Sequence, residues 1–235
     1  MKSRIQTIRE SERLSHTKIY TDEELYHTDS WLSKPIKTVR EIMELFSGYE
    51  FFRALDLGCG VGRNSIYVAE CFKGKECLVD CVDLLDIAIE KLNDNAKAHG
   101  VSERINGIAG TIEDFEIAKD EYDFIMAVSA LEHVESEERF LCALGSIRDG
   151  VRENGVVCMV INSEVSECDS VTKEPLEAQF EVNLSADKVL AYVDEVFRGW
   201  KVIKRTVSRQ EYDVPRETAV SRLSTKVVTC VAKRE

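Results

Sequence analysis

The residues LDLGCGVGRNS, at positions 55–65, constrain the fold most, because an apolar run ends there in three glycines. Gly58, Gly60 and Gly62 stand at alternate positions, directly before a segment with helical spacing. Glycine allows a positive φ and, having no Cβ, lets a ligand approach the main chain. Free N–H groups at the start of the following helix favour an anionic group. The stretch therefore predicts a buried strand, a ligand-binding loop and a helix in succession.

Strand-like and helix-like segments alternate along the chain as far as residue 162. Short apolar runs predict the strands, and apolar residues at helical spacing predict the helices between them. The predicted strands are 51–57, 77–83, 104–110, 122–129 and 156–162, and the predicted helices between them are 63–72, 85–100 and 136–155. Strands joined by helix-length crossovers indicate an α/β fold, a doubly wound and mostly parallel sheet with helices on both faces.

Further elements flank this alternating region. Residues 33–47 predict a helix that Ser33 caps, with Pro35 in the first turn. Residues 185–197 predict a later helix. Two closing strands are predicted at 201–208 and 225–233.

We expect a single domain over residues 1–235. Within it, residues 1–47 form a helical cap or lid region. Residues 163–183 are polar and acidic and long for a connection, and loops of that length are usually functional or mobile. They are therefore a candidate insertion on the substrate side, where their acidic side chains either attract a cationic acceptor or form a solvated face.

Composition limits the partners and the compartment. The net charge of −12 repels phosphate backbones and argues against nucleic-acid binding. No apolar run approaches the roughly 20 residues that span a bilayer, and the first residues contain no apolar signal segment. The eight cysteines form no CxxC pair, which predicts buried free thiols and no metal site. We expect a cytoplasmic protein without a membrane partner, either a monomer or a homodimer.

Two acidic residues accompany the glycine loop. Asp56 precedes it, and Asp83 ends the next predicted strand, roughly 20 residues on, where dinucleotide folds place a ribose-binding acid. Asp80 competes with Asp83 but falls inside the strand. Arg63 stands where a GxGxxG fingerprint requires its third glycine. An acid beside the loop suits a ligand with ammonium and sulfonium groups, such as S-adenosylmethionine, better than a pyrophosphate.

With these motifs in place, the sequence resembles the class I S-adenosylmethionine-dependent methyltransferases. LDLGCGVGRN matches their first motif, VDCVDLLDIAI the second, and GTIEDF with YDFIMAVSALEHV the third and fourth, while ENGVVCMVIN is similar to the strand that follows. The strings DLGCGVGRNSIYVAE and FRGWKVIK look like the type 11/12, tellurite-resistance (TehB-like) small-molecule branch. The resemblance implies a seven-stranded sheet of order 3-2-1-4-5-7-6 with strand seven antiparallel.

The resemblance also implies roles by position. The loop and its preceding acid would bracket the methionine moiety, Asp83 would hold the ribose and Leu84 would pack on the adenine. Thr111 stands where family members often have the Asp that binds the adenine amino group. The residues implied to bind S-adenosylmethionine, or its product S-adenosylhomocysteine, are Asp56, Gly58, Cys59, Gly60, Gly62, Asp83, Leu84, Thr111, Ile112, Glu113 and Ser129.

Methyl transfer is an in-line displacement at a sulfonium, so an enzyme mainly has to align the acceptor. A general base matters only for an acceptor that is protonated at the working pH. His133, after the fourth predicted strand, is the candidate base, and a structural hydrogen bond is the alternative. The candidate substrate residues, which either form a lid or simply pack, are Tyr20, Tyr26, His27 and Trp31, together with His133. His16 and His99 are predicted to be surface residues.

The leading hypothesis is an enzyme that methylates a small molecule with S-adenosylmethionine. An RNA or protein methyltransferase and a non-catalytic protein that binds S-adenosylmethionine stay open as alternatives. An NAD-dependent dehydrogenase is disfavoured by Arg63.

Overall fold

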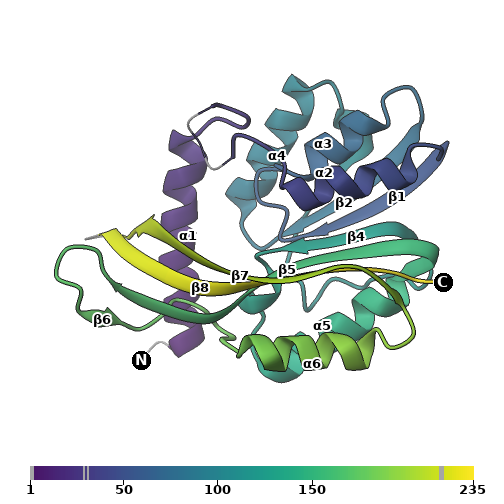
Figure 1. Ribbon diagram of the computed structural model, residues 1–235. Coiled ribbons are helices and arrows are strands. Elements are labelled where there is room, and N and C mark those ends of the chain that lie inside the picture. Colours follow the sequence, from purple (N-terminus) through teal and green to yellow (C-terminus); the bar gives the residue numbers. More distant parts are fainter. Residues whose placement is uncertain (1–2, 29, 31, 217–219) are drawn as a thin grey trace.

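An eight-stranded sheet forms the centre of the computed structural model, which describes residues 3–28, 30, 32–216 and 220–235 (Figure 1). The strand order is β3-β2-β1-β4-β5-β8-β7, and β6 pairs with β5 off this path. The strands are β1 (Phe51–Leu57), β2 (Glu76–Asp83), β3 (Ile105–Ala109), β4 (Tyr122–Val128), β5 (Val151–Asp169), β6 (Pro175–Leu176), β7 (Lys201–Pro215) and β8 (Val220–Lys233).

The direction and order of the strands confirm the predicted topology. Strands β1 to β5 pair in parallel, whereas β8 runs antiparallel to β5 and to β7. Since β7 and β8 are the sixth and seventh predicted strands, this is the order 3-2-1-4-5-7-6. The short β6 is an eighth strand that the sequence pattern does not predict. The order reverses between β1 and β4, and ligands of such sheets bind beyond the carboxyl ends of the strands at that point.

Helices cover both faces of the sheet, as predicted. In Figure 1, α2, α3 and α4 lie over one face, α5 and α6 lie over the other, and α1 stands across one end of the strands. The helices are α1 (Arg4–Asp22), α2 (Lys37–Met43), α3 (Ser65–Cys71), α4 (Asp86–Ala98), α5 (Glu137–Gly150) and α6 (Ala186–Val196), with short 3₁₀ turns η1 (Glu44–Phe46), η2 (Ser102–Arg104) and η3 (Leu131–His133). Over the described residues, none of the helices combines the length and the apolar character that crossing a bilayer requires.

The alternating side chains of β1 divide the core into two layers. Phe52 and Ala54 belong to the apolar cluster on the face of α2, α3 and α4, whereas Leu55 and Leu57 belong to the cluster on the face of α5 and α6. Side chains of a strand point to opposite faces in turn, so a strand covered on both sides is apolar at both sets of positions. Strand β4 is accordingly buried at all its positions.

The predicted caps of α5, α6 and α4 are confirmed. Ser136 accepts a hydrogen bond from the Arg139 N–H, and Ser185 accepts one from the Lys188 N–H. Gly100, just beyond α4, has a φ of +66°, the left-handed conformation that commonly ends a helix.

The predicted start of the helix over 33–47 is wrong. Helix α2 begins at Lys37, its N-cap is Ile36, and Ser33 makes no cap hydrogen bond there. The Ile36 N–H donates instead to Asn64 Oδ1, at 3.1 Å. A tertiary partner from the glycine-loop region therefore replaces the local cap.

The connection predicted after residue 162 is also wrong in part, because β5 continues to Asp169. Between Ser163 and Ser166 the register against β8 shifts, and Glu164 takes a φ of +48°. From 163 to 167 buried and exposed residues alternate, so this polar stretch is a half-buried strand. Strand β5 also starts earlier than predicted, at Val151, where α5 has just ended. The long β8 supplies the backbone partners that the local sequence does not reveal.

Candidate functional site

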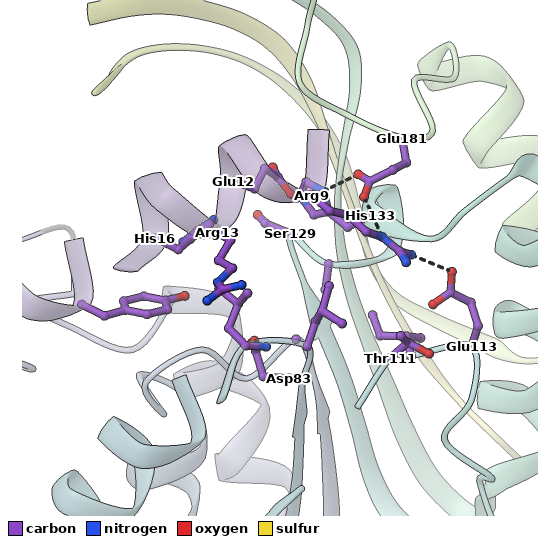
Figure 2. A pocket seen from close by; sticks show the side chains of 16 residues that line it. Arg9, Glu12, Arg13, His16, Asp83, Thr111, Glu113, Ser129, His133 and Glu181 are labelled. Atoms are coloured by element: carbon purple, nitrogen blue, oxygen red, sulfur yellow. Dashed lines mark hydrogen bonds and ion pairs between the residues drawn. The ribbon is translucent and has the colours of Figure 1, made fainter. Parts of the chain in front are cut away.

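A cavity of about 130 Å³ lies beneath α1 at the carboxyl ends of β1, β2 and β4 (Figure 2). This is the switch point of the strand order. The residues that line it are Arg9, Glu12, Arg13, His16, Tyr20, Gly58, Asp83, Leu84, Leu85, Thr111, Ile112, Glu113, Ser129, Ala130, His133 and Glu181. Of the predicted site residues, the cavity thus brings together Tyr20, Gly58, Asp83, Leu84, Thr111, Ile112, Glu113, Ser129 and His133.

Gly58 forms the floor of the cavity where β1 turns toward α3. Its N–H donates to the Val82 carbonyl at 2.8 Å, and so does the N–H of Cys59 at 3.0 Å. Gly58 has a φ of +72°, and a Cβ there would lie 2.4 Å from the Cβ of Ala130. Glycine is therefore required both by the backbone conformation and by the close approach of the loop after β4.

Asp83 closes the cavity at the end of β2. Its Oδ2 accepts a hydrogen bond from the Gly60 N–H at 2.8 Å, and its Oδ1 accepts one from the Leu85 N–H at 2.9 Å. Burial raises the pKa of the Asp83 carboxyl, although these two hydrogen bonds oppose the shift. Each carboxylate oxygen can accept more than one hydrogen bond, so both keep acceptor capacity for a ligand.

Asp80, the competing acid, is committed elsewhere. It accepts hydrogen bonds from Arg53 at 2.9 Å, from Asn106 at 2.7 Å and from the Tyr122 hydroxyl at 3.0 Å. It is 5% exposed and does not line the cavity. Of the two acids, only Asp83 is available to a ligand there.

The wall opposite α1 carries the predicted adenine-side residues. Leu84 is 46% exposed and offers an apolar surface. The Thr111 hydroxyl donates to the Asp114 carboxylate at 2.7 Å and accepts from the Asp114 N–H at 3.0 Å, so a turn already uses this side chain. Ser129 has a φ of +53°, a conformation that non-glycine residues seldom adopt.

The predicted residues that lie outside the lining pack around the loop instead. Asp56 is 1% exposed and accepts a hydrogen bond from the Ser65 hydroxyl at the start of α3. Burial raises the pKa of Asp56 to about 7, although the hydrogen bond from Ser65 acts in the opposite direction. Cys59 is buried, and a Cβ on Gly62, whose φ is +91°, would lie 2.5 Å from Leu92. These residues hold the shape of the loop from below.

Of the predicted substrate residues before α2, one lines the cavity and two others lie elsewhere. Tyr20 lines the cavity, and its hydroxyl lies 3.0 Å from where a Cβ on Gly60 would be. The Tyr26 hydroxyl instead donates to the Arg63 carbonyl at 2.8 Å, and its ring meets His99 edge-on. His27 is exposed and is absent from the lining. Trp31 lies outside the described residues.

Helix α1 supplies the residues that the sequence pattern misses. Arg9, Glu12, Arg13 and His16 all face the cavity from α1 (Figure 2), and Tyr20 continues the same stripe. His16 is therefore not the surface residue that the sequence predicts, and its buried Nδ1 has no hydrogen-bond partner among the described residues. Spacings of three and four residues place side chains on one helix face, so the sequence does contain the spacing of this stripe. Because the stripe is polar, a search for apolar periodicity does not find it.

His133 is held between two carboxylates. Its Nδ1 lies 3.1 Å from Glu12 Oε2 and 3.0 Å from Glu181 Oε2, and its ring stacks on Phe180. Burial by itself lowers the pKa of His133, but Glu12 and Glu181 outweigh it and raise the pKa well above the usual value. The raised pKa favours the charged form of the ring, and the contacts with Glu12 and Glu181 tie α1 to the far side of the cavity.

A network of ion pairs extends this tie. Arg9 lies 3.4 Å from Glu181, 3.2 Å from Glu135 and 3.6 Å from Glu113. Glu12, His133 and Glu181 also offer three ligand atoms within 4.8 Å of one another, an arrangement that could hold a metal ion. The sequence predicts no metal here, and the residues come from three distant segments. His133 and Arg9 both contact Glu181, and His133 also contacts Glu12, so these carboxylates already have cationic side chains as partners.

Replacing His133 by glutamine should make the stability of the protein less dependent on pH. A raised pKa in the folded state stabilises it fully below the unfolded value, about 6.5, and the contribution is lost as pH rises through the folded pKa. Hydrogen bonds to charged groups contribute about 1.5–3 kcal/mol. Urea unfolding from pH 6 to pH 10 should therefore show the gap between wild type and His133→Gln shrinking with rising pH.

The control for that series is His99→Gln. His99 Nδ1 also faces a glutamate, at 3.2 Å, but that glutamate, Glu70, is 31% exposed, against 1% for Glu181, and an ion pair with an exposed partner contributes about 0–1 kcal/mol. A gap for His133→Gln that stays constant over the whole pH range would contradict a cationic His133.

The comparisons with known proteins agree with this geometry. A family model described as a methyltransferase domain matches residues 54–155. The norajmaline N-methyltransferase of Rauvolfia serpentina is 28% identical over 87 residues, which are 37% of this chain and 29% of that protein. An uncharacterized protein of Synechococcus is 26% identical over 117 residues, 50% of this chain and 27% of that protein. Both matches span less than a third of the length of these relatives.

Solved structures share the fold at low identity. TehB from Haemophilus influenzae has a TM-score of 0.60 at 20% identity, covering 83% of this chain and 62% of that one. The 1,6-didemethyltoxoflavin-N1-methyltransferase of Burkholderia thailandensis, solved with S-adenosylhomocysteine and 1,6-didemethyltoxoflavin, has a TM-score of 0.59 at 16% identity, covering 100% and 91%. The [4+2]-cyclase SpnF has a TM-score of 0.63 at 11% identity, covering 99% and 96%. These likenesses establish the fold alone, since a fold can host unrelated reactions.

Proposed function

This chain carries a class I methyltransferase domain at residues 54–155, and on that premise we propose that it transfers a methyl group from S-adenosylmethionine to a small-molecule acceptor. The observation that carries the proposal is the position of Asp83. It ends β2 at the switch point and lines the cavity, and each of its oxygens accepts one backbone N–H, from Gly60 and from Leu85.

The cavity has the chemistry that S-adenosylmethionine requires. Asp83 would accept hydrogen bonds from both hydroxyls of the ribose. Leu84 and Ile112 offer apolar surface for the adenine, and the cavity floor at Gly58 is bare main chain. The methionine end would lie toward Ser129 and α1. Asp56 supports the loop in this arrangement and does not contact the ligand.

When bound, S-adenosylmethionine supplies an electrophilic methyl group on a sulfonium with a good leaving group. The residues of this chain then have to position an acceptor and exclude water, which can account for several kcal/mol of the barrier. The two glutamates raise the pKa of His133, which disfavours this ring as a general base. This favours an acceptor whose lone pair is free at the working pH.

Helix α1 acts as a lid in this proposal. The cavity of about 130 Å³ is smaller than the roughly 300–1,000 Å³ of usual ligand sites, so α1 has to move outward to admit ligands. Its contacts include exposed ion pairs such as Arg4 with Glu177, which contribute little each. The segment 176–182 faces α1 across the cavity through Glu181, which supports the substrate-side role of residues 163–183.

We extend the proposal to partners and location on physical grounds. A net charge of −12 disfavours an RNA target. All eight cysteines are free thiols, which suits a reducing compartment such as the cytoplasm. A second candidate stays open, a protein that binds S-adenosylmethionine and does not transfer its methyl group, because one fold can host unrelated reactions.

Calorimetry and a methyl-transfer screen test the proposal together. We expect binding of S-adenosylmethionine and S-adenosylhomocysteine but none of NAD. Radiolabelled S-adenosylmethionine should label at least one acceptor in a panel of thiols, amines, carboxylates and metalloid oxyanions. Binding without labelled product across the panel would favour the non-catalytic candidate, and absence of binding would refute both. Labelling of RNA that weakens with salt would favour the RNA alternative.

A further inference from the structure

Strand β7 forms a long open edge of the sheet. It pairs with β8 over its whole length, and no described strand pairs with its other side. The hairpin of β7 and β8 extends beyond the helices that cover the rest of the sheet (Figure 1). A long edge strand presents unpaired N–H and C=O groups that can pair with another strand.

The middle of this edge is uncovered on both faces. Every residue from 205 to 213 is exposed, although successive side chains point to opposite faces. Val207 is 45% exposed, Tyr212 is 39% exposed, and Val202 near the start of the strand is 59% exposed. No helix therefore stands in the way of a strand approaching from outside, and apolar side chains are available on the edge.

Charges are segregated along β7. Its basic residues, Lys201, Lys204, Arg205 and Arg209, come first, and its acidic residues, Glu211 and Asp213, come last. Basic residues on an edge strand usually oppose pairing with another strand. Like charges on the approaching strand add to this effect, whereas acidic residues on it counteract it. Two copies of β7 that pair antiparallel bring the basic half of each against the acidic half of the other.

We infer that this protein forms a two-fold symmetric dimer in which the β7 edges of two copies pair antiparallel about Ser208. Arg205 then lies opposite Glu211 of the partner subunit, and Lys204 lies opposite Tyr212 of the partner subunit. The regular register ends there, because β7 has an irregularity between Val202 and Lys204. No like charges stand directly opposite in this register. Parallel pairing would set each cation against its own counterpart, which is unfavourable. A two-fold contact of this kind is self-complementary, as closed dimers require.

A groove beside the start of β7 supports a second copy as the occupant. It has a volume of about 210 Å³ and lies between α6 and the ends of β7 and β8, with Phe197, Trp200 and Val202 among its lining residues. In the paired arrangement the end of the partner subunit's β7 runs past Val202 to the mouth of this groove. The edge and the groove would thus be covered together.

Sedimentation of charge variants tests the pairing, independently of any ligand or activity. The wild-type chain should sediment as a dimer at micromolar concentration. Arg205→Glu and Glu211→Arg should each raise the dissociation constant at least about tenfold, because each change places like charges opposite one another twice. The double variant should restore the dimer. Arg205 also pairs with Asp194, and Glu211 also pairs with Arg209, so circular dichroism and urea unfolding of each variant serve as the control that the fold is kept.

Cross-linking tests the register. Residues opposite one another on paired strands have Cβ atoms about 4.5–5.5 Å apart, so Ser208→Cys should give a covalent dimer with a short bismaleimide. The matched controls are the wild type, whose Cys71 and Cys142 are already exposed, and Ser102→Cys, an exposed site beside β3 at the other end of the sheet. The inference would be overturned by a wild-type chain that is still monomeric at about 100 µM, because a dimer with a micromolar dissociation constant would be formed at that concentration. A dimer that is indifferent to both charge variants and to cross-linking at 208 would also overturn it.

Discussion

Replacing Asp83 by alanine should weaken binding of S-adenosylhomocysteine at least about 100-fold. The change removes the acceptor for the ribose hydroxyls, and hydrogen bonds to a charged group contribute about 1.5–3 kcal/mol each. It also frees the N–H groups of Gly60 and Leu85, which the carboxylate now orders at 2.8 Å and 2.9 Å. Titration calorimetry of both proteins measures the ratio directly.

Asp80→Asn is the matched control for that experiment. Asp80 lies on the same strand but faces Arg53, Asn106 and Tyr122 and not the cavity. The control should lower the midpoint of thermal unfolding and leave the affinity for S-adenosylhomocysteine within about twofold, since distant sites are usually independent. Unchanged affinity in a folded Asp83→Ala protein would remove Asp83 from the binding site.

Replacing Gly58 by alanine should destabilise the protein by about 2–5 kcal/mol. A positive φ costs an ordinary residue about 1–2 kcal/mol, and overpacking costs about 1–3 kcal/mol more. The added methyl group would lie 2.4 Å from the Cβ of Ala130, which cannot rotate away because it is fixed to the backbone. Urea unfolding gives the free energy, and calorimetry should show lost ligand binding as well, because Gly58 lines the cavity.

Gly74→Ala separates the two causes. Gly74 has a φ of +86°, close to that of Gly58, but a Cβ there would have no atom within 4 Å. The Gly74→Ala variant should lose only the conformational part of the unfolding free energy, about 1–2 kcal/mol. Its ligand binding should be unchanged. Equal losses at the two positions would show that the contact with Ala130 does not matter.

The sequence was a good guide wherever one segment decided its own structure. Short apolar runs predicted β1 to β5, and apolar residues at helical spacing predicted the helices between them. The glycine spacing and the strand-end acid pointed to the edge of the sheet where Gly58 and Asp83 meet. The extension of β5 to Asp169 was missed because its polar residues are buried by a partner strand, β8, that lies some 50 residues on in the chain, a long-range pairing of the kind that local patterns do not encode.

The amino-acid sequence by itself thus determined the doubly wound sheet and the bare loop after its first strand, because burial patterns and glycine geometry are local properties, whereas the order of the strands was implied only by the resemblance to a family. Only the tertiary structure decided that α1 covers the cavity, that His133 lies between Glu12 and Glu181, and that β7 is left open at the edge. Those features depend on which distant segments come to lie side by side. The electrostatic field at His133 is the sum of charges from three such segments, so no single stretch of the chain could reveal it.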